Sequence, residues 1–115
     1  MRLESLRRFA LGLPHTTVVK QWGENLVFKV AGKMFLIVAL DGAIAESVIF
    51  KCTPDEFDDL TEIDGVRQAP YCAKRHWVQV QDLSATTETE LERLIRHSYD
   101  LVFAKLPKKL QATLK

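Results

Sequence analysis

Two apolar segments joined by a three-residue link decide the fold: Asn25-Leu-Val-Phe-Lys-Val30, Ala31-Gly-Lys33 and Met34-Phe-Leu-Ile-Val-Ala-Leu40. The first segment alternates, which is typical of a β-strand, and the second is an apolar run of strand length. The link is too short for anything except a hairpin turn, and its glycine can adopt a positive φ. We therefore expect a hairpin with Lys33 at its tip.

The neighbouring segments extend this hairpin into an antiparallel meander. Asp41-Gly42 indicates a second turn, and Ser47-Val-Ile-Phe-Lys-Cys52 is typical of a third strand. Upstream, residues 15–23 favour a loop that leads into an edge strand. Downstream, we expect a loop from Gly65 through Pro70 and then a fourth main strand over residues 77–80.

Two helices are predicted before and after this meander. Leucines and Phe9 recur at helical spacing over the first dozen residues, and Gly12 and Pro14 end that helix. Thr53-Pro-Asp-Glu56 is typical of a capped helix start, and Asp64-Gly65 of its end. We expect the carboxylates of this second helix to face solvent: Asp55, Glu56, Asp58, Asp59 and Glu62.

The longest predicted element is a helix near the C-terminus. Thr87 and Glu90 are spaced as a capping box, and apolar residues then follow helical periodicity up to Leu106. His97 and Asp100 fall outside the apolar stripe, so we expect both to face solvent. Pro107 interrupts the helix and can start a short terminal one.

Length and composition indicate one soluble domain over residues 1–115. The chain is 47% hydrophobic and 27% charged, and its formal net charge of +1 gives no overall attraction to nucleic acid. Cys52 and Cys72 lack CxxC spacing, so no zinc site is expected, and two lone thiols favour a reducing compartment. No signal peptide or membrane-spanning stretch is recognised. We expect a cytoplasmic monomer with no membrane contact.

The most unusual local chemistry lies in Lys74-Arg-His-Trp77, where a basic tripeptide runs directly into a tryptophan. Cations beside an aromatic ring suit a phosphate and a base, or an acidic partner. Alternatively, Trp77 anchors a strand in the core and the basic run is its solvated approach. In a strand, Trp77 and Gln79 would share one face and His76 and Val78 the other.

The order of five short motifs resembles the MmcQ/YjbR family of small bacterial proteins over nearly the whole chain: Gly32-Lys-Met-Phe35, Lys51-Cys-Thr-Pro-Asp55, Lys74-Arg-His-Trp77, His97-Ser-Tyr-Asp-Leu-Val102 and Lys105-Leu-Pro-Lys-Lys109. The resemblance implies a two-layer α+β fold of the frataxin/CyaY type, an antiparallel sheet with helices packed on it. Members have been described as carrying a double-wing DNA-binding motif. A frataxin-like fold also raises iron binding, against which Arg2, Arg7 and Arg8 outnumber Glu4 in the first helix.

The leading hypothesis is a DNA-binding module, whose binding should be weak, unspecific and salt-dependent because phosphate contacts carry no sequence information. Its candidate residues are Lys33, Lys74, Arg75, His76 and Trp77. The alternative is a protein-interaction or small-ligand module that uses a sheet face near Trp22 and Trp77. No nucleophile elbow, phosphate loop or metal-ligand spacing is present, so neither an enzyme activity nor a cofactor is expected.

Overall fold

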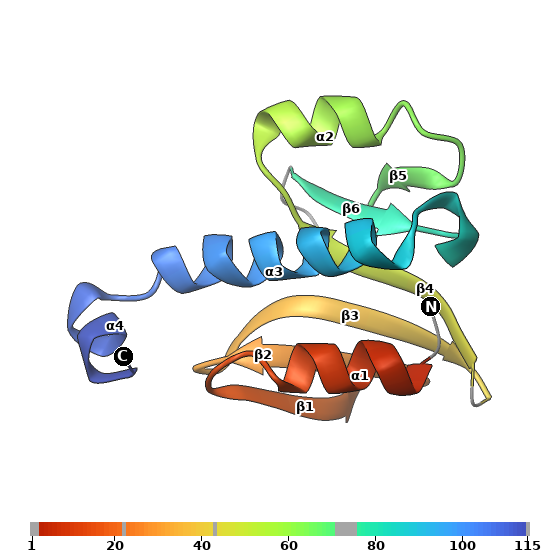
Figure 1. Ribbon diagram of the computed structural model, residues 1–115. Helices are drawn as coiled ribbons and strands as arrows, with labels where there is room; N and C mark the ends of the chain where they lie inside the picture. Colours follow the sequence, from red (N-terminus) through yellow and green to blue (C-terminus); the bar gives the residue numbers. More distant parts are fainter. Residues whose placement is uncertain (1–2, 22, 43, 71–75, 115) are drawn as a thin grey trace.

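A computed structural model describes residues 3–21, 23–42, 44–70 and 76–114 (Figure 1). In chain order the elements are α1 (Leu3–Leu11), β1 (Thr16–Gln21), β2 (Asn25–Val30), β3 (Lys33–Asp41), β4 (Ile44–Lys51), α2 (Pro54–Leu60), β5 (Val66–Gln68), β6 (Trp77–Val80), a 3-10 turn (Leu83–Ala85), α3 (Glu88–Ala104) and α4 (Lys108–Leu114).

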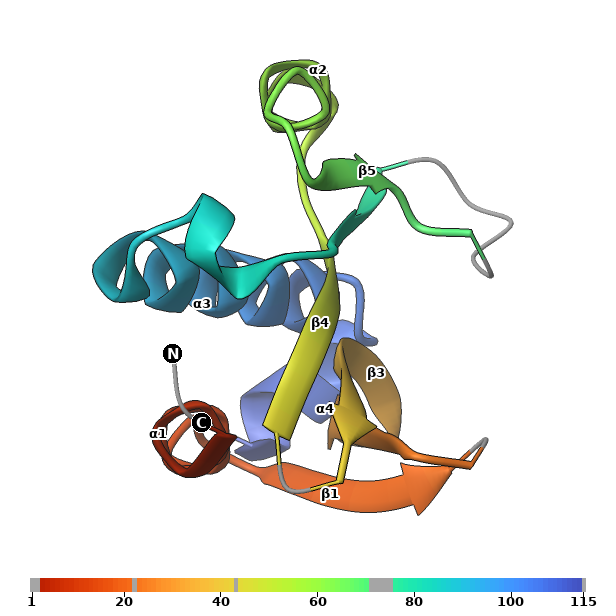
Figure 2. The same ribbon diagram turned by 90° about the vertical axis from the view of Figure 1, so that its right-hand side faces the viewer.

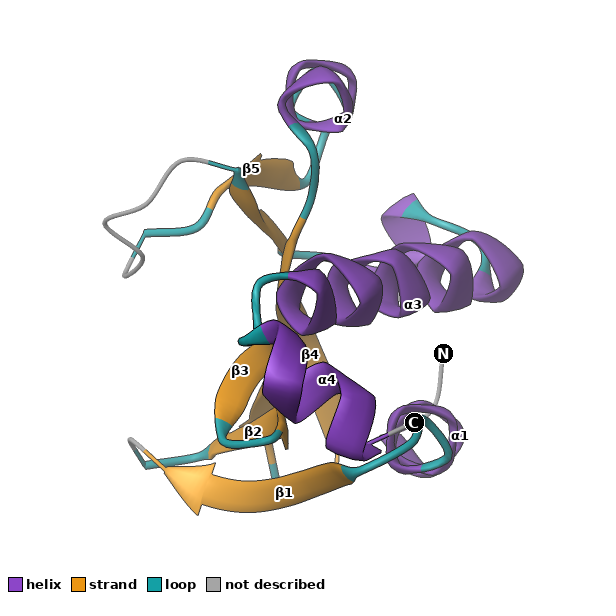
Figure 3. Ribbon diagram, turned by 90° about the vertical axis from the view of Figure 1, so that its left-hand side faces the viewer, coloured by secondary structure: helices purple, strands orange, loops and turns teal. Residues whose placement is uncertain are grey.

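The described strands form one antiparallel sheet in the order β1-β2-β3-β4-β6-β5. Figures 2 and 3 view the molecule from opposite sides, and both place α1 and α3 on the same side of β4. The expected α+β class and the β2–β4 meander are confirmed. The prediction of a continuous loop from Gly65 through Pro70 was wrong. Within it lies β5, a three-residue strand that pairs with β6 at the sheet edge.

The main core lies between the sheet and α1 and α3. Its largest fully buried side chains are supplied by both layers, and Phe28, Phe35 and Phe50 come from three adjacent strands. The T-shaped contact between Phe35 and Tyr99, with ring centroids 5.3 Å apart, joins β3 to α3. Burial of several such aromatic and aliphatic side chains, each contributing roughly 1.5–3 kcal/mol, holds the helices on this face.

A β-bulge at Phe35 adapts β3 to this core. Phe28 pairs with Leu36 and Lys29 with Met34, so Phe35 is the extra residue of β3. Phe35 and Leu36 are consecutive, yet both are fully buried in the main core. The bulge therefore places two large side chains in a row on the helix-covered face, where a regular strand would place one.

The β2–β3 hairpin forms around a two-residue turn. Val30 pairs with Lys33, and Ala31 and Gly32 both have positive φ, 50° and 80°. Two positive φ angles are typical of a type I′ turn, whose twist matches that of the strands it joins. The expected hairpin and its positive-φ glycine are confirmed.

The two helix starts differ in how completely they are capped. Thr53 and Glu56 form the expected capping box of α2, although α2 ends at Leu60, before Asp64-Gly65. At α3, the Thr87 side chain accepts the Glu90 N–H at 3.1 Å, whereas the Glu90 carboxylate binds Arg93 and does not return to the cap. Among the described helices, none is both long and apolar enough to cross a membrane.

Candidate nucleic-acid interface

The sheet face opposite α1 and α3, here called the second face, carries a smaller apolar cluster. It contains Val27, Ile37, Ile49, Ala69 and Trp77, with Met34 packed against it. Trp77 is only 7% exposed, because its ring completes this cluster. Trp77 is therefore a core residue of β6 and presents little surface on which a nucleic-acid base could stack. Trp22, the other tryptophan of the alternative hypothesis, lies outside the described residues.

Sheet register brings two lysines to one end of the second face. Lys29 lies opposite Met34, and Lys51 lies opposite Trp77, so both lysines alternate with residues of the apolar cluster. Their strands, β2 and β4, flank β3, which separates their backbones by about 10 Å. Lys29 was not singled out from the sequence, because its position beside Lys51 depends on pairing through β3.

Lys33 adds a third cation at the same end of the sheet. It is exposed and begins β3, directly after the type I′ turn. Lys33 pairs with Val30, whose side chain lies in the main core. Lys33 therefore projects from the hairpin tip on the helix-covered side of the sheet. The expected placement of Lys33 at an exposed tip is confirmed.

His76 is held in an unusual conformation where the chain enters β6. Its φ is 73°, in a region of backbone conformation that residues other than glycine rarely adopt. The His76 carbonyl accepts the Cys52 N–H at 2.7 Å, and its ring meets Phe57 edge to face, with centroids 6.0 Å apart. His76 is thus half-buried and anchored on α2. Lys74 and Arg75, which precede it, lie outside the described residues.

Two other charged residues lie elsewhere in the described sheet. Arg67 donates from Nε to the side-chain oxygen of Gln79 at 2.9 Å, while Asp41 lies at the opposite end of β3 from Lys33. Lys29, Lys33, Lys51 and His76 are therefore grouped apart from this carboxylate. We call these four residues the basic end of the sheet.

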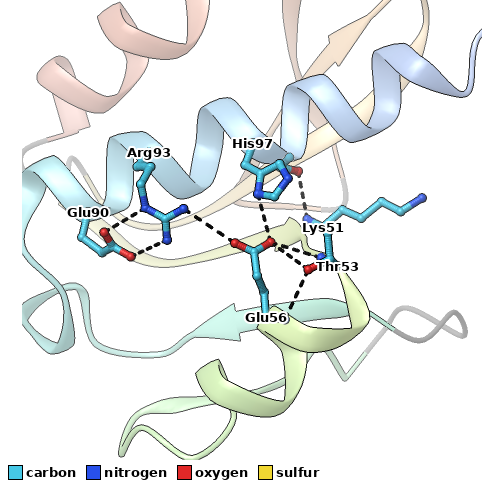
Figure 4. A network of polar contacts seen from close by, with 7 residues as sticks. Lys51, Thr53, Glu56, Glu90, Arg93 and His97 are labelled. Atoms are coloured by element: carbon cyan, nitrogen blue, oxygen red, sulfur yellow. Dashed lines mark hydrogen bonds and ion pairs between the residues drawn. The ribbon is translucent and has the colours of Figure 1, made fainter.

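Sequence reasoning missed a charged network between α2 and α3 (Figure 4). Glu56 Oε1 lies 2.9 Å from His97 Nδ1, and Glu56 Oε2 lies 3.7 Å from Arg93. Arg93 is itself held by Glu90 at 2.7 Å. The expectation that Glu56 and His97 both face solvent was wrong. The two side chains contact each other between α2 and α3, and both are only partly exposed.

This network changes the acidity of Glu56. Partial burial raises the pKa of the Glu56 carboxyl, but the Thr53 backbone N–H and the charge and hydrogen bond of His97 lower it by more. The net effect is a pKa below the ordinary value, so Glu56 stays ionised at neutral pH. Nothing in the spacing of residues 56 and 97 marks them as partners.

Three successive backbone amides bind this network to the basic end of the sheet. Lys51 N–H donates to Ser98 Oγ at 2.9 Å, Cys52 N–H donates to the His76 carbonyl, and Thr53 N–H donates to Glu56 Oε1 at 3.2 Å. The junction between β4 and α2 is thereby fixed by α3, by the start of β6 and by its own helix cap.

The buried thiol of Cys52 is unsuited to metal binding or nucleophilic attack. Burial, and then the charge of Glu56, raise the pKa of Cys52 to about 12, so the thiol stays protonated. Among the described residues, no three histidine, cysteine, aspartate or glutamate side chains form a group that could hold a metal ion.

A family model described as YjbR matches residues 11–101. The chain belongs to the YjbR family. The matched range includes every described residue of the basic end of the sheet and both partners of the Glu56–His97 contact. The resemblance drawn from the five short motifs is therefore confirmed.

Solved structures agree with this YjbR-family fold. Deinococcus radiodurans protein DR2400, a DUF419 domain, is 24% identical and has a TM-score of 0.84, with 97% of this chain and 86% of that chain covered. A Pseudomonas syringae protein is 20% identical with a TM-score of 0.71, covering 89% of this chain and 99% of that chain. Among curated proteins, none matches the sequence. The structural likenesses concern the fold alone.

Proposed function

We propose that this YjbR-family domain binds duplex DNA through the basic end of the sheet, and that it acts as a binding module without a catalytic step. The observation that carries the proposal is the register that groups Lys29 with Lys51 on the second face. Lys33 is an exposed cation at the neighbouring hairpin tip, and the sequence carries Lys74 and Arg75, which lie outside the described residues, directly before His76.

The residue types suit phosphate contacts better than base contacts. Lysine is a flexible point charge that approaches phosphate oxygens without a fixed geometry. Trp77 is buried, so the proposal assigns it no stacking role. A net charge of +1 supplies little long-range attraction, and binding should therefore be weak, local and steeply dependent on salt.

Fluorescence anisotropy of a labelled duplex tests the proposal. We would compare the wild type with Lys29→Ala/Lys33→Ala and with Lys74→Ala/Arg75→Ala between 20 and 200 mM salt, about the range in which counterion release dominates. Each lost phosphate contact should reduce the slope of log K against log salt by about 0.9. We expect either double variant to weaken binding and to flatten this slope.

The matched control is Arg7→Ala/Arg8→Ala, which removes the same charge from α1, on the helix-covered side of the sheet. Equal loss of affinity in the control and the two test variants would show a general charge effect and contradict the proposed interface. Absence of wild-type binding at the lowest salt would refute DNA binding altogether. A single-stranded DNA of the same length shows whether the duplex is preferred.

A further inference from the structure

The basic end of the sheet depends on a junction that it does not itself stabilise. Lys51 is the last residue of β4, and the carbonyl of His76 is held by Cys52, the next residue along the chain. Any movement of residues 51–53 would therefore displace Lys51 and His76 together. The placement of two of the four residues in the basic end is set at this one point.

Two consecutive residues of α3 contact this junction. Ser98 is fully buried and receives the Lys51 N–H, whereas His97 reaches the Glu56 carboxylate, which in turn accepts the Thr53 N–H. Ser98 thus acts on the backbone of β4 directly. His97 acts one step further away, through the side chain that caps α2.

The contact between His97 and Glu56 is better placed than an ordinary surface ion pair. The Glu56 side chain is only 22% exposed and the His97 side chain 36% exposed, so solvent screens the pair less than it screens fully exposed charges. Glu56 also accepts the Thr53 hydroxyl at 3.2 Å. In its observed orientation the Glu56 carboxylate makes all of these contacts together.

We propose that His97 is a positioning residue for the DNA interface: through Glu56 it fixes the β4–α2 junction and thereby the placement of Lys51 and His76. This inference rests on the proposed function, since it assigns a positioning role to a residue that does not itself touch DNA. His97 orients the Glu56 carboxylate toward the Thr53 amide. Phe57, the next residue of α2, packs on the His76 ring and carries the constraint to the start of β6.

Two readouts test the inference in the full chain. Amide hydrogen exchange, followed by NMR, measures the opening of the junction at Lys51, Cys52 and Thr53, and anisotropy measures affinity for duplex DNA. His97→Ala should speed exchange of the Cys52 and Thr53 amides about tenfold, while the amides of Val27 and Ile37 in the sheet centre keep their rates. The same variant should weaken DNA binding severalfold at low salt.

Two further α3 variants separate positioning from general effects. His97→Asn places a side-chain N–H at the same number of bonds from Cα as Nδ1 of His97, the atom that contacts Glu56, and it should restore most of the protection and the affinity. Arg96→Ala removes the neighbouring ion pair with Asp100 and also changes the charge of α3, yet it should leave the junction amides unchanged. If His97→Ala does not fold, His97→Leu, which fills part of the space of the ring but donates no hydrogen bond to Glu56, takes its place.

The outcomes distinguish this inference from the proposed function. Unchanged exchange rates of the Cys52 and Thr53 amides in His97→Ala overturn the positioning role, whatever the affinity of the variant for DNA. Faster exchange with wild-type affinity for DNA shows that the junction does not govern the interface, and overturns the role in binding. No DNA binding by the wild type refutes the proposed function and with it the role in binding, while exchange alone then decides whether His97 fixes the junction.

Discussion

The hydroxyl of Ser98 donates a hydrogen bond to the carbonyl oxygen of Phe35 at 2.7 Å and links α3 to the bulge of β3. The same hydroxyl accepts the N–H of Lys51, the residue that follows the last β3–β4 pair. The Ser98 side chain therefore bridges the Lys51 N–H of β4 and the Phe35 carbonyl of β3, two backbone groups on neighbouring strands. All three groups are in or beside the main core, where unpaired polar groups are costly.

Ser98→Ala should destabilise the protein by about 2–4 kcal/mol, because it removes a buried hydrogen bond to the Phe35 carbonyl and a partly buried one from the Lys51 N–H. Urea unfolding should show a lower midpoint with an unchanged slope. Thr89→Ala, an exposed change on the same helix, is the control and should shift the midpoint little. Equal midpoints for Ser98→Ala and wild type would contradict the bridging role.

Ala31→Asn should stabilise the β2–β3 hairpin. Ala31 adopts a φ of 50°, which asparagine tolerates better than alanine, and Asn-Gly is the favoured pair in a type I′ turn. We expect a gain of about 0.5–1 kcal/mol, seen as a higher melting temperature in calorimetry. Gly32→Ala, at φ 80°, should have the opposite effect, and a rise in melting temperature for that variant would exclude the turn geometry.

Glu56→Gln should lower stability at neutral pH but not in acid. Because its folded-state pKa is below the ordinary value, ionised Glu56 stabilises the fold above about pH 4.3, and this contribution is lost as the pH falls through the folded pKa. The groups facing this carboxylate are Thr53, Cys52, Arg93 and His97. We expect a difference of about 1 kcal/mol at pH 7.

Urea titrations of Glu56→Gln and wild type at several pH values measure this difference. The two free energies of unfolding should converge as the pH falls below the ordinary glutamate pKa of about 4.3 and then through the lower folded pKa of Glu56. Glu62→Gln removes an equal charge from an exposed position just beyond α2 and serves as the control. A difference that stays constant from pH 7 to acid would show that the charge of Glu56 does not contribute.

Cys52 should resist thiol reagents in the folded protein. Burial and the nearby Glu56 raise its pKa from 9.0 to about 12, which lowers the thiolate fraction at pH 8 by roughly a thousandfold. In a Cys72→Ser background, the reaction of Cys52 with Ellman's reagent should therefore be slow until the chain is unfolded in guanidinium chloride. Similar rates in the folded and unfolded chain would disprove the shielding.

Local features could be predicted from the sequence, because their interactions connect residues a few positions apart. The capping box joins Thr53 to Glu56, and the β2–β3 turn joins Val30 to Lys33. Such patterns are visible in one short window of sequence. For β5, by contrast, three residues are too few to show alternation, and the strand forms only because β6 is there to pair with it.

The candidate site was only partly predictable for the same reason. Lys33 could be placed at a turn from its immediate neighbours. Lys29 joins Lys51 only through the register of β3, and Glu56 meets His97 only because the fold brings the first turn of α2 within side-chain reach of α3. The burial of Trp77 likewise depends on Val27, Ile37 and Ile49 from three other strands, so the sequence left two interpretations open.

The bulge at Phe35 also links two positions in the history of the family. A relative with one residue fewer in this strand would keep the alternation of Met34 and Leu36, but it would have no surplus carbonyl for a hydroxyl on α3 to bind. Selection for serine at position 98 would then be relaxed, and the codon could drift to alanine. Gain or loss of that single strand residue and the identity of residue 98 should therefore change together along lineages.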